Sequence, residues 1–175
     1  MDNPFTIRRL GAAETRAAVP ALGEVLLDCV RGGASVSFMA DITRDEAEAF
    51  WLGVAQAAAD DGRAVLVAED GDGVLGVVEV IPAGSPNQPH RADIAKMLVH
   101  RRARRRGVGE ALMRAAEAAA RDMGKTLLTL DTVTGGVAER LYARLGWVAV
   151  GSIPDYALMP DGAMCATTVF YKALA

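Results

Sequence analysis

The sequence predicts an α/β fold, in which helices cover a mixed β-sheet. A strand, a helix and a second strand follow one another between residues 94 and 130, an order typical of a parallel pair joined by a right-handed crossover. Two apolar runs on either side of Asp70-Gly71-Asp72-Gly73 predict an antiparallel hairpin as well. The chain has 175 residues, of which 51% are hydrophobic and 23% charged, so we expect one domain over residues 1–175 with its own core.

The first part of the chain predicts one strand and two helices. Residues 5–9 are expected to form a short strand, and residues 15–30 carry apolar side chains at helical spacing up to the stop signal Gly32-Gly33. A second helix is expected after Thr43, because this N-cap residue is followed three positions later by Glu46, as in a capping box.

The rest of the chain alternates between strands and helices. The hairpin strands are expected at residues 64–68 and 74–81, and the prolines and glycine between residues 82 and 89 predict a loop. A strand over residues 91–99 is followed by a helix that lies between Gly107 and Gly124. Then come a strand over 126–130 that ends at Asp131, a helix over 137–145, and two strands over 147–150 and 167–171.

The composition excludes several classes of protein. The formal net charge is −3 and basic charge is concentrated between Arg101 and Arg106, so nucleic acid is not expected as a partner. Cys29 and Cys165 have neither metal-ligand spacing nor a disulfide framework, so we expect a cytoplasmic protein without a metal site. The start, Met1-Asp2-Asn3-Pro4, lacks a signal-peptide pattern, and no apolar stretch approaches the roughly 20 residues needed to span a bilayer. We therefore expect no membrane association.

The most informative segment is the turn between the strand over 91–99 and the helix that follows. An arginine-rich run leads into Gly107-Val108-Gly109, so unpaired backbone N–H groups, a helix N-terminus and guanidinium groups converge on one point. Such a point binds a pyrophosphate-like anion. A P-loop is excluded because no Lys-Ser or Lys-Thr follows either glycine, and a dinucleotide fingerprint would need a third glycine where Leu112 stands.

The segment Arg104-Arg105-Arg106-Gly107-Val108-Gly109 resembles motif A of the GNAT superfamily of acetyltransferases, which binds the pyrophosphate of acetyl-CoA. The flanking strands and the later run Ala138-Glu139-Arg140-Leu141-Tyr142-Ala143-Arg144-Leu145-Gly146-Trp147 follow the order of that superfamily. Over nearly the whole chain, the pattern is most similar to the tabtoxin resistance acetyltransferases, in residues 32–41, 90–93, 130–132, 160–162 and 170–172. The resemblance implies a GNAT-type mixed, mostly antiparallel sheet, with a central parallel strand pair splayed around acetyl-CoA and helices on its flanks.

The resemblance also implies how acetyl-CoA, the acyl donor, is held. The turn from Arg104 to Glu110 is expected to bind the diphosphate, and the end of the preceding strand the pantetheine arm, with the Met97 amide donating to the acyl oxygen. The cofactor-binding residues expected in this way are Met97, Leu98, Val99, Arg104, Arg105, Arg106, Gly107, Val108, Gly109, Glu110 and Ala138. Gly135 stands where the superfamily commonly has an asparagine, which removes one hydrogen bond to the cofactor.

Acetyl transfer to an amine also needs a proton acceptor and a proton donor. Strand alternation places Asp93 on the face of Met97 and Val99, and Asp131 ends the next strand, so both carboxylates are candidate bases; an N-cap or a loop-anchoring salt bridge is the alternative for each. The resemblance implies that Tyr142 protonates the departing thiolate, although its helical spacing also fits a core tyrosine. The side chains expected to wall the acceptor pocket, or simply to connect two helices, are Ser35, Phe38 and Met39.

Together these features predict an acetyl-CoA-dependent N-acetyltransferase that acts on a small polar amine by direct attack in a ternary complex. The tabtoxin-type resemblance implies an amino-acid-like antimetabolite or antibiotic as acceptor, and a homodimer is left open. One alternative is a non-catalytic acyl-CoA sensor on the same fold. The other is a nucleic-acid binder that uses the arginine run, which the acidic net charge disfavours.

Overall fold

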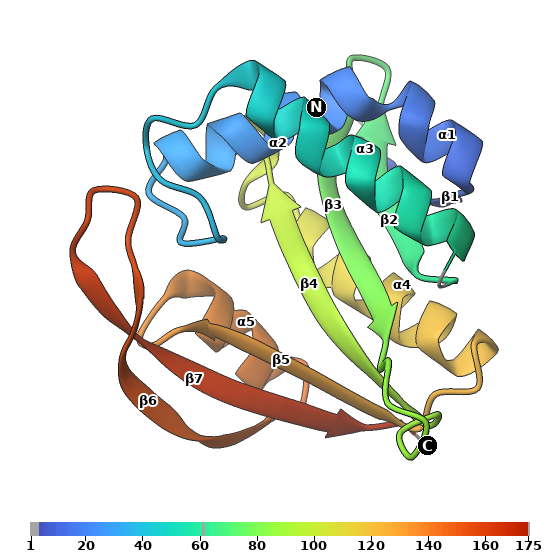
Figure 1. Cartoon of the computed structure of the whole chain (residues 1–175), viewed down its shortest axis with the longest axis vertical. Helices are drawn as coiled ribbons and strands as arrows, with labels where there is room; N and C mark the ends of the chain where they lie inside the picture. The colour runs from blue at the N-terminus through green and yellow to red at the C-terminus, as the bar shows by residue number, and fades with distance from the viewer. Residues whose placement is uncertain (1–3, 61, 175) are drawn as a thin grey trace.

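The computed structural model describes residues 4–60 and 62–174. Residues 1–3, which belong to the segment predicted not to be a signal peptide, lie outside the described residues. The strands are β1 Thr6–Leu10, β2 Ala64–Asp70, β3 Gly73–Pro82, β4 Arg91–Val99, β5 Leu127–Val133, β6 Val148–Leu158 and β7 Met164–Ala173. The helices are α1 Ala12–Ala17, α2 Val19–Arg31, α3 Arg44–Asp60, α4 Val108–Asp122 and α5 Val137–Arg144, with a 3-10 turn, η1, at Arg101–Ala103. The seven strands form one sheet in the order β1-β2-β3-β4-β5-β7-β6 (Figure 1).

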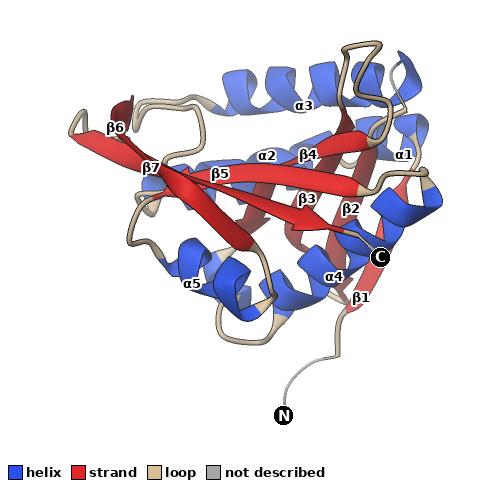
Figure 2. Ribbon diagram, turned by 90° about the horizontal axis from the view of Figure 1, so that it is seen from below, coloured by secondary structure: helices blue, strands red, loops and turns tan. Residues whose placement is uncertain are grey.

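Helices cover both faces of this sheet and create two separate cores. Figure 2 shows α1, α2 and α3 on one face and α4 and α5 on the other. The core under α4 joins Leu112 and Met113 to strand residues such as Ile94 and Leu128. The core under α2 and α3 is filled by Leu22, Leu26 and Trp51 against Val65, Val67, Val77 and Leu98. None of the helices in the described residues combines the length and the apolar content that a membrane span needs.

The helix starts follow local signals, with one correction. Thr43 caps α3 through the predicted capping box: its backbone N–H and hydroxyl both donate to Glu46 Oε2 at 2.8 Å. The single helix predicted over residues 15–30 is wrong, because the chain forms α1 and then α2. Pro20 lies in the first turn of α2, where a residue without an N–H group can begin a helix but cannot continue one.

The sheet is antiparallel except at its centre. β4 and β5 run parallel, as predicted, and pair at Arg91↔Leu127, Ala92↔Leu128 and Asp93↔Thr129. Beyond Asp93 the two strands diverge (Figure 1), which leaves one edge of β4 without a neighbouring strand. This fork is the feature of the fold that positions the site.

The strands after α4 are longer than predicted. β5 continues through Asp131 to Val133, because Thr132 and Val133 stay in register with Thr168 and Thr167 of β7. The expectation that Asp131 ends its strand is therefore wrong. β6 and β7 form a long hairpin rather than two short strands, and β6 is the edge of the sheet.

Candidate active site

The arginine-rich turn forms a main-chain concavity at the start of α4. Gly107 caps the helix with φ of +78°, and Arg105 also has a positive φ, of +64°. The first hydrogen bond that closes a turn of α4 runs from Ala111 N to Gly107 O at 3.0 Å. The amides of residues 108–110 therefore precede the helical hydrogen bonds and point out of the helix end, where a diphosphate would bind.

Gly109 joins this turn to the end of β4. A Cβ atom at Gly109 would lie 3.3 Å from Leu141 Cδ2 and 3.8 Å from both Met97 Sδ and Val99 Cγ2. The glycine thus lets the helix start approach β4 and α5 closely. As a result, the predicted diphosphate turn and the predicted pantetheine strand are adjacent parts of one surface.

Most arginines of this run form ion pairs with carboxylates of the protein. The Arg101 side chain donates to the carboxylate of Asp28, which also accepts from the Arg101 backbone N–H at 2.8 Å. Arg102 and Arg106 lie 3.2 Å and 3.6 Å from the carboxylate of Asp70, whose side chain is only 2% exposed. These ion pairs fix the turn to α2 and to the β2–β3 hairpin.

Two arginines of the run remain exposed near the turn. Arg104 reaches back with Nε at 3.5 Å from the Val99 carbonyl oxygen, and Arg105 forms no ion pair within the described part of the chain. Glu110, another predicted cofactor residue, pairs with Arg114 at 2.8 Å on the surface of α4. Of the predicted side chains, Arg104 and Arg105 are therefore the ones best placed to meet a phosphate.

A β-bulge changes which face each residue of β4 presents. The register passes from Glu79↔Ala95 to Val77↔Leu98, so Lys96 and Met97 together oppose one residue of β3, and Lys96 has φ of +48°. Met97 and Val99 consequently pack against the core under α4, whereas Leu98 joins the other core. The prediction that Asp93 shares a face with Met97 and Val99 is wrong, because simple alternation does not hold across a bulge.

Asp93 lies at the apex of the fork, on the sheet face opposite the α4 core. Its neighbours Ala92 and Ile94 point into that core, so the carboxylate points the other way. Asp93 Oδ1 accepts hydrogen bonds from Arg91 Nη1, at 2.5 Å, and from the hydroxyl of Thr129 on β5. The carboxylate is half exposed, with 44% of its side chain accessible.

Asp131 shares this face, two residues beyond Thr129 on β5. It is exposed, and its Oδ2 accepts a hydrogen bond from the Thr167 hydroxyl at 3.0 Å. Burial lowers the pKa of Lys96 on β4 and raises that of Tyr142 on α5; the negative charge of Asp131 opposes the first shift and adds to the second. Both predicted carboxylates therefore look onto the same opening between β4 and β5.

Tyr142 is buried in α5, with its ring between Trp147 and Phe170 at centroid distances of 6.1 Å and 6.0 Å. Burial, and then the charge of Asp131, raises the pKa of its phenol well above the usual value. The Tyr142 hydroxyl makes no hydrogen bond within the described residues, but it is not among the fully buried polar atoms, so it keeps some contact with solvent. The ring of Tyr142 belongs to the core under α4. Ala138, one turn earlier, also packs against this core.

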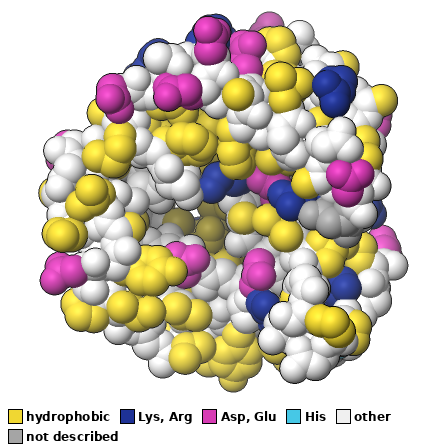
Figure 3. Space-filling view, viewed as in Figure 1, with side chains coloured by type: hydrophobic (Ala, Val, Ile, Leu, Met, Phe, Trp, Pro, Cys, Tyr) yellow, Lys and Arg dark blue, Asp and Glu magenta, His cyan; other side chains and the backbone are white. Residues whose placement is uncertain are grey.

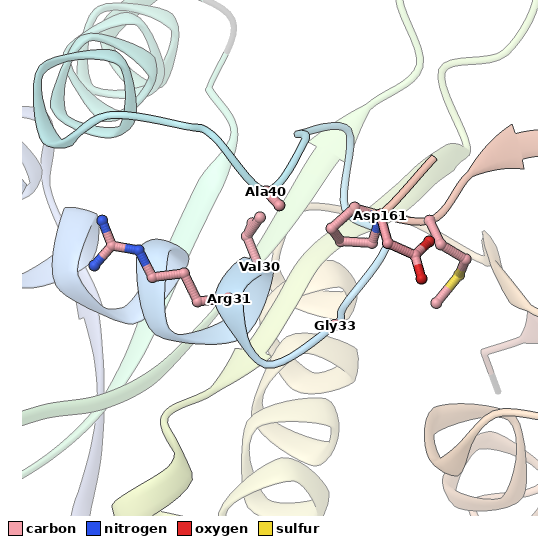
Figure 4. Close-up of a pocket in the computed structure, with 7 residues that line it drawn as sticks. Val30, Arg31, Gly33, Ala40 and Asp161 are labelled. Atoms are coloured by element: carbon pink, nitrogen blue, oxygen red, sulfur yellow. The ribbon is translucent and has the colours of Figure 1, made fainter. Parts of the chain in front are cut away.

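The loop over residues 32–43, which we call the acceptor-side loop, contains the residues predicted to wall the acceptor pocket. This loop is tied to the β6–β7 hairpin: Ser35 Oγ donates to Leu158 O at 2.8 Å and Ala40 N to Pro160 O at 3.1 Å. A small pocket of about 170 Å³ lies at this junction, with Val30, Arg31 and Ala40 on one side and Asp161 on the other (Figure 4). Ser35 is thus an anchor of the wall.

Phe38 and Met39 face a larger pocket, of about 490 Å³, which they line together with Ser37, Asp41 and Thr43. The space-filling view shows a hollow near the middle of the molecule, where β4 and β5 part, with acidic and basic side chains around it (Figure 3). Among the described residues, no group of three His, Cys, Asp or Glu side chains is arranged to hold a metal ion.

The comparison with known protein families agrees with this geometry. The family described as the acetyltransferase (GNAT) family matches residues 32–147, about two thirds of the chain. The chain belongs to this acetyltransferase family. The matched segment runs from the acceptor-side loop to Trp147, and so includes the turn, the fork and Tyr142.

Solved structures of other acetyltransferases share the fold over almost the whole chain. The yncA protein of Salmonella typhimurium, solved with its cofactor acetyl-CoA, has a TM-score of 0.80 at 20% identity and covers 98% of this chain and 95% of its own. A GCN5-related N-acetyltransferase from Kribbella flavida reaches 0.78 at 25% identity, over 97% and 98%. A phosphinothricin acetyltransferase from Sinorhizobium meliloti, in complex with acetyl-CoA, reaches 0.78 at 17% identity, over 98% and 89%.

One residue at the fork, Lys96, was not among the predicted site residues. Lys96, on the bulge of β4, points toward the acceptor-side loop, where its Nζ donates to Ser37 Oγ at 3.2 Å. The ammonium also lies 5.3 Å from the ring centroid of Phe50 and 6.0 Å from that of Phe38. Burial lowers its pKa, against the charges of Glu79 and Asp131. A single lysine inside the apolar strand residues 92–99 was the signal that could have drawn attention to it.

Proposed function

We propose that this acetyltransferase moves the acetyl group of acetyl-CoA to the amine of a small polar molecule, by direct attack in a ternary complex. The observation that carries the proposal is the fork: β4 loses its parallel partner after Asp93 and runs directly to the main-chain concavity before α4. A thioester carrier with a diphosphate fits a surface that offers an unpaired strand edge followed by orphan amides.

The residues of the chain fit acetyl-CoA in three places. The amides of residues 108–110 suit the diphosphate, the exposed guanidinium groups of Arg104 and Arg105 suit a phosphate, and the open edge of β4 around Met97, Leu98 and Val99 suits the pantetheine arm. The Salmonella and Sinorhizobium structures hold acetyl-CoA on the same fold, which supports this assignment. When bound, acetyl-CoA supplies an acyl group activated as a thioester.

The carboxylates on the acceptor face suit the proton transfer that the amine needs. A free aliphatic amine has a pKa on the order of 10, so it arrives protonated and must lose a proton before it can attack. Asp131 is assigned as the group that accepts this proton, directly or through water, because it is exposed and its charge acts on Lys96 of the other strand of the fork. Asp93, held by Arg91 and Thr129 at the apex, is assigned a supporting role in the same step.

Tyr142 suits the other end of the reaction. Its phenol remains protonated throughout the physiological range, because burial raises its pKa, and its hydroxyl makes no hydrogen bond to another described residue. The tyrosine can therefore donate a proton to a departing thiolate while the new C–N bond forms and the C–S bond breaks. No covalent acyl-enzyme is required.

An amino-acid-like antimetabolite or antibiotic is the acceptor class that we propose. Two of the similar structures are named as phosphinothricin acetyltransferases, and the sequence pattern resembles the tabtoxin resistance acetyltransferases. Both comparisons point to acceptors that carry an amino-acid backbone. In this proposal the chain acts in the cytoplasm on small molecules.

The decisive experiment is the release of free CoA thiol from acetyl-CoA in the presence of single amines. The panel contains phosphinothricin, proteinogenic amino acids, polyamines and β-lactam-containing amino acids, and the Gly109→Asp variant serves as the inactive control. We expect amine-dependent thiol release and a matching acetylated product by mass spectrometry. Tight acetyl-CoA binding without thiol release from any amine would instead identify an acyl-CoA sensor and overturn the proposal.

A further inference from the structure

Lys96 occupies an unusual position for a lysine. Its side chain leaves the strand at the bulge and is half-buried between the loop over residues 32–43 and helix α3. The partners of its Nζ are the Ser37 hydroxyl and the faces of Phe38 and Phe50. No carboxylate of the described residues lies within 4.0 Å of it. A half-buried ammonium without an ion-pair partner is costly, and its retention calls for an explanation.

Backbone strain is concentrated at the same place. Lys96 has φ of +48° and Ser37 has φ of +79°, and these are two of the four non-glycine residues with positive φ in the described part of the chain. The hydrogen bond from Lys96 Nζ to Ser37 Oγ joins these two strained residues, although 59 positions separate them in sequence. Strained conformations of this kind cluster at ligand-binding sites, where the surrounding structure holds them in place.

The two carboxylates whose charges act on Lys96, those of Glu79 and Asp131, have other partners. Glu79 is engaged by Arg63, whose Nη1 lies 3.1 Å from Glu79 Oε2, and Asp131 accepts its hydrogen bond from Thr167. Lys96 and Asp131 therefore stand on opposite strands of the fork, one positive and one negative, without forming a salt bridge. That arrangement is complementary to a molecule that carries both an ammonium and an anionic group.

We propose that Lys96 and Ser37 form an anion-recognition subsite of the acceptor pocket, so that the acceptor is an amine that also carries a carboxylate or a phosphorus oxyanion. The inference rests on the proposed acetyl transfer to a small amine and adds the residue that selects the acceptor. The amine faces Asp131, while the anionic group accepts hydrogen bonds from Lys96 Nζ and Ser37 Oγ. Phe38 and Phe50 exclude water around the ammonium and so strengthen its attraction for an anion.

The test compares matched acceptors that differ only in the anionic group. L-Methionine is assayed beside its carboxamide and its decarboxylated amine, which removes the carboxylate. Phosphinothricin is assayed beside L-methionine, which has the same amino-acid backbone and a neutral thioether in place of the phosphinate. The enzyme is compared with Lys96→Met, which keeps an apolar stem and removes the charge, and with Lys96→Arg, which keeps the charge. Lys125→Met is the control, because Lys125 donates to the Pro89 carbonyl oxygen on the surface away from the fork.

We expect the wild-type enzyme to prefer the anionic acceptor by about 10-fold or more in kcat/KM, and Lys96→Met to lose about 10- to 100-fold on that acceptor, chiefly through KM. The neutral partner should change by less than about 3-fold, and the Kd for acetyl-CoA should not change, which separates lost recognition from lost folding. Lys96→Arg should recover part of the preference. Calorimetric titration of the same compounds into the acetyl-CoA-loaded enzyme gives a readout that does not need turnover.

Two results would overturn the inference and leave the proposed function standing. One is equal kcat/KM both for L-methionine and its carboxamide and for phosphinothricin and L-methionine; the other is an equal loss on anionic and neutral acceptors in Lys96→Met. Acetylation of Lys96 itself, seen by mass spectrometry, would also overturn it and would mark the lysine as an acyl acceptor. If no amine supports thiol release, the proposed function fails separately, and equal calorimetric affinity for acids and amides then decides against the subsite as well.

Discussion

The two walls of the cleft are built in different ways. On the cofactor side, Asp28 and Asp70, with side chains 6% and 2% exposed, hold Arg101, Arg102 and Arg106 and fix the main chain of the turn. On the acceptor side, hydrogen bonds from Ser35, Ala40 and Cys165 tie the loop over residues 32–43 to the β6–β7 hairpin, and residues of this loop line the larger pocket. Main-chain donors behind buried ion pairs suit a ligand common to a whole family, whereas a side-chain-lined loop suits one that varies between members.

On the cofactor side, the substitution expected to weaken acetyl-CoA binding most is Gly109→Asp. The new carboxylate would crowd Leu141 and Met97 and would repel the diphosphate, so we expect the Kd for acetyl-CoA to rise about 100-fold or more. Isothermal titration with CoA measures this change.

The matched control for that substitution is Gly53→Asp on α3, where a Cβ would meet nothing within 4 Å. It adds the same charge to a helix and should leave CoA binding unchanged. If Gly109→Asp bound CoA as well as the wild type while its circular dichroism stayed normal, the diphosphate would not bind at this turn.

On the acceptor side, the strongest test is of the carboxylates on β4 and β5. Asp131→Asn keeps an oxygen that can accept the Thr167 hydrogen bond, so its fold should be preserved, but it cannot take a proton. We expect kcat to fall about 100-fold with the Kd for acetyl-CoA unchanged. The loss should be greatest at low pH, where the free amine is scarcest, and should shrink as the pH rises.

Asp93→Asn is the natural comparison, because Arg91 and Thr129 already engage that carboxylate. We expect a smaller loss of turnover than for Asp131→Asn, measured over the same pH range. A larger loss in Asp93→Asn would reverse the two roles and make the residue at the apex of the fork the base.

The difference between the walls also explains what could be predicted from the sequence. The parallel β4–β5 pair, the turn before α4 and the capping box at Thr43 follow from local signals, since the glycines and the cap residue act within a few positions. The break between α1 and α2 had such a signal too, in Pro20. The length of β5 depended instead on its pairing with β7, which is a contact distant in sequence.

The site was less predictable because its details depend on tertiary structure. The bulge at Lys96 and Met97 shifts the alternation of β4, and nothing in residues 91–99 marks it. The arginine run looked like a set of phosphate ligands, but the acidic partners of three of its members lie 32 to 73 positions earlier in the sequence. Lys96 acquires its surroundings from α3 and the loop before it, so its environment could not be inferred from the strand alone.

Tyr142 packs in the core and is also the proposed proton donor. The variant Tyr142→Phe separates the contribution to stability from the contribution to turnover. Phenylalanine keeps the ring contacts with Trp147 and Phe170, so the free energy of unfolding should change by less than about 1 kcal/mol. Loss of the proton donor should lower kcat by about 10-fold. Unchanged kcat, measured beside an unchanged thermal midpoint, would leave Tyr142 with a packing role alone.

The smallest expected effect tests whether rigidity of the cofactor wall matters at all. Asp70→Asn removes the negative charge that holds Arg102 and Arg106, so the turn should gain mobility and the Kd for acetyl-CoA should rise about 3- to 10-fold. Asp72→Asn, which removes the neighbouring charge of the same hairpin, is the control. The KM for the acceptor should stay constant in both variants. If the KM for the acceptor rose as well, the cofactor side and the acceptor side would be mechanically coupled through β4. The two sides would then not act independently, although they are built differently.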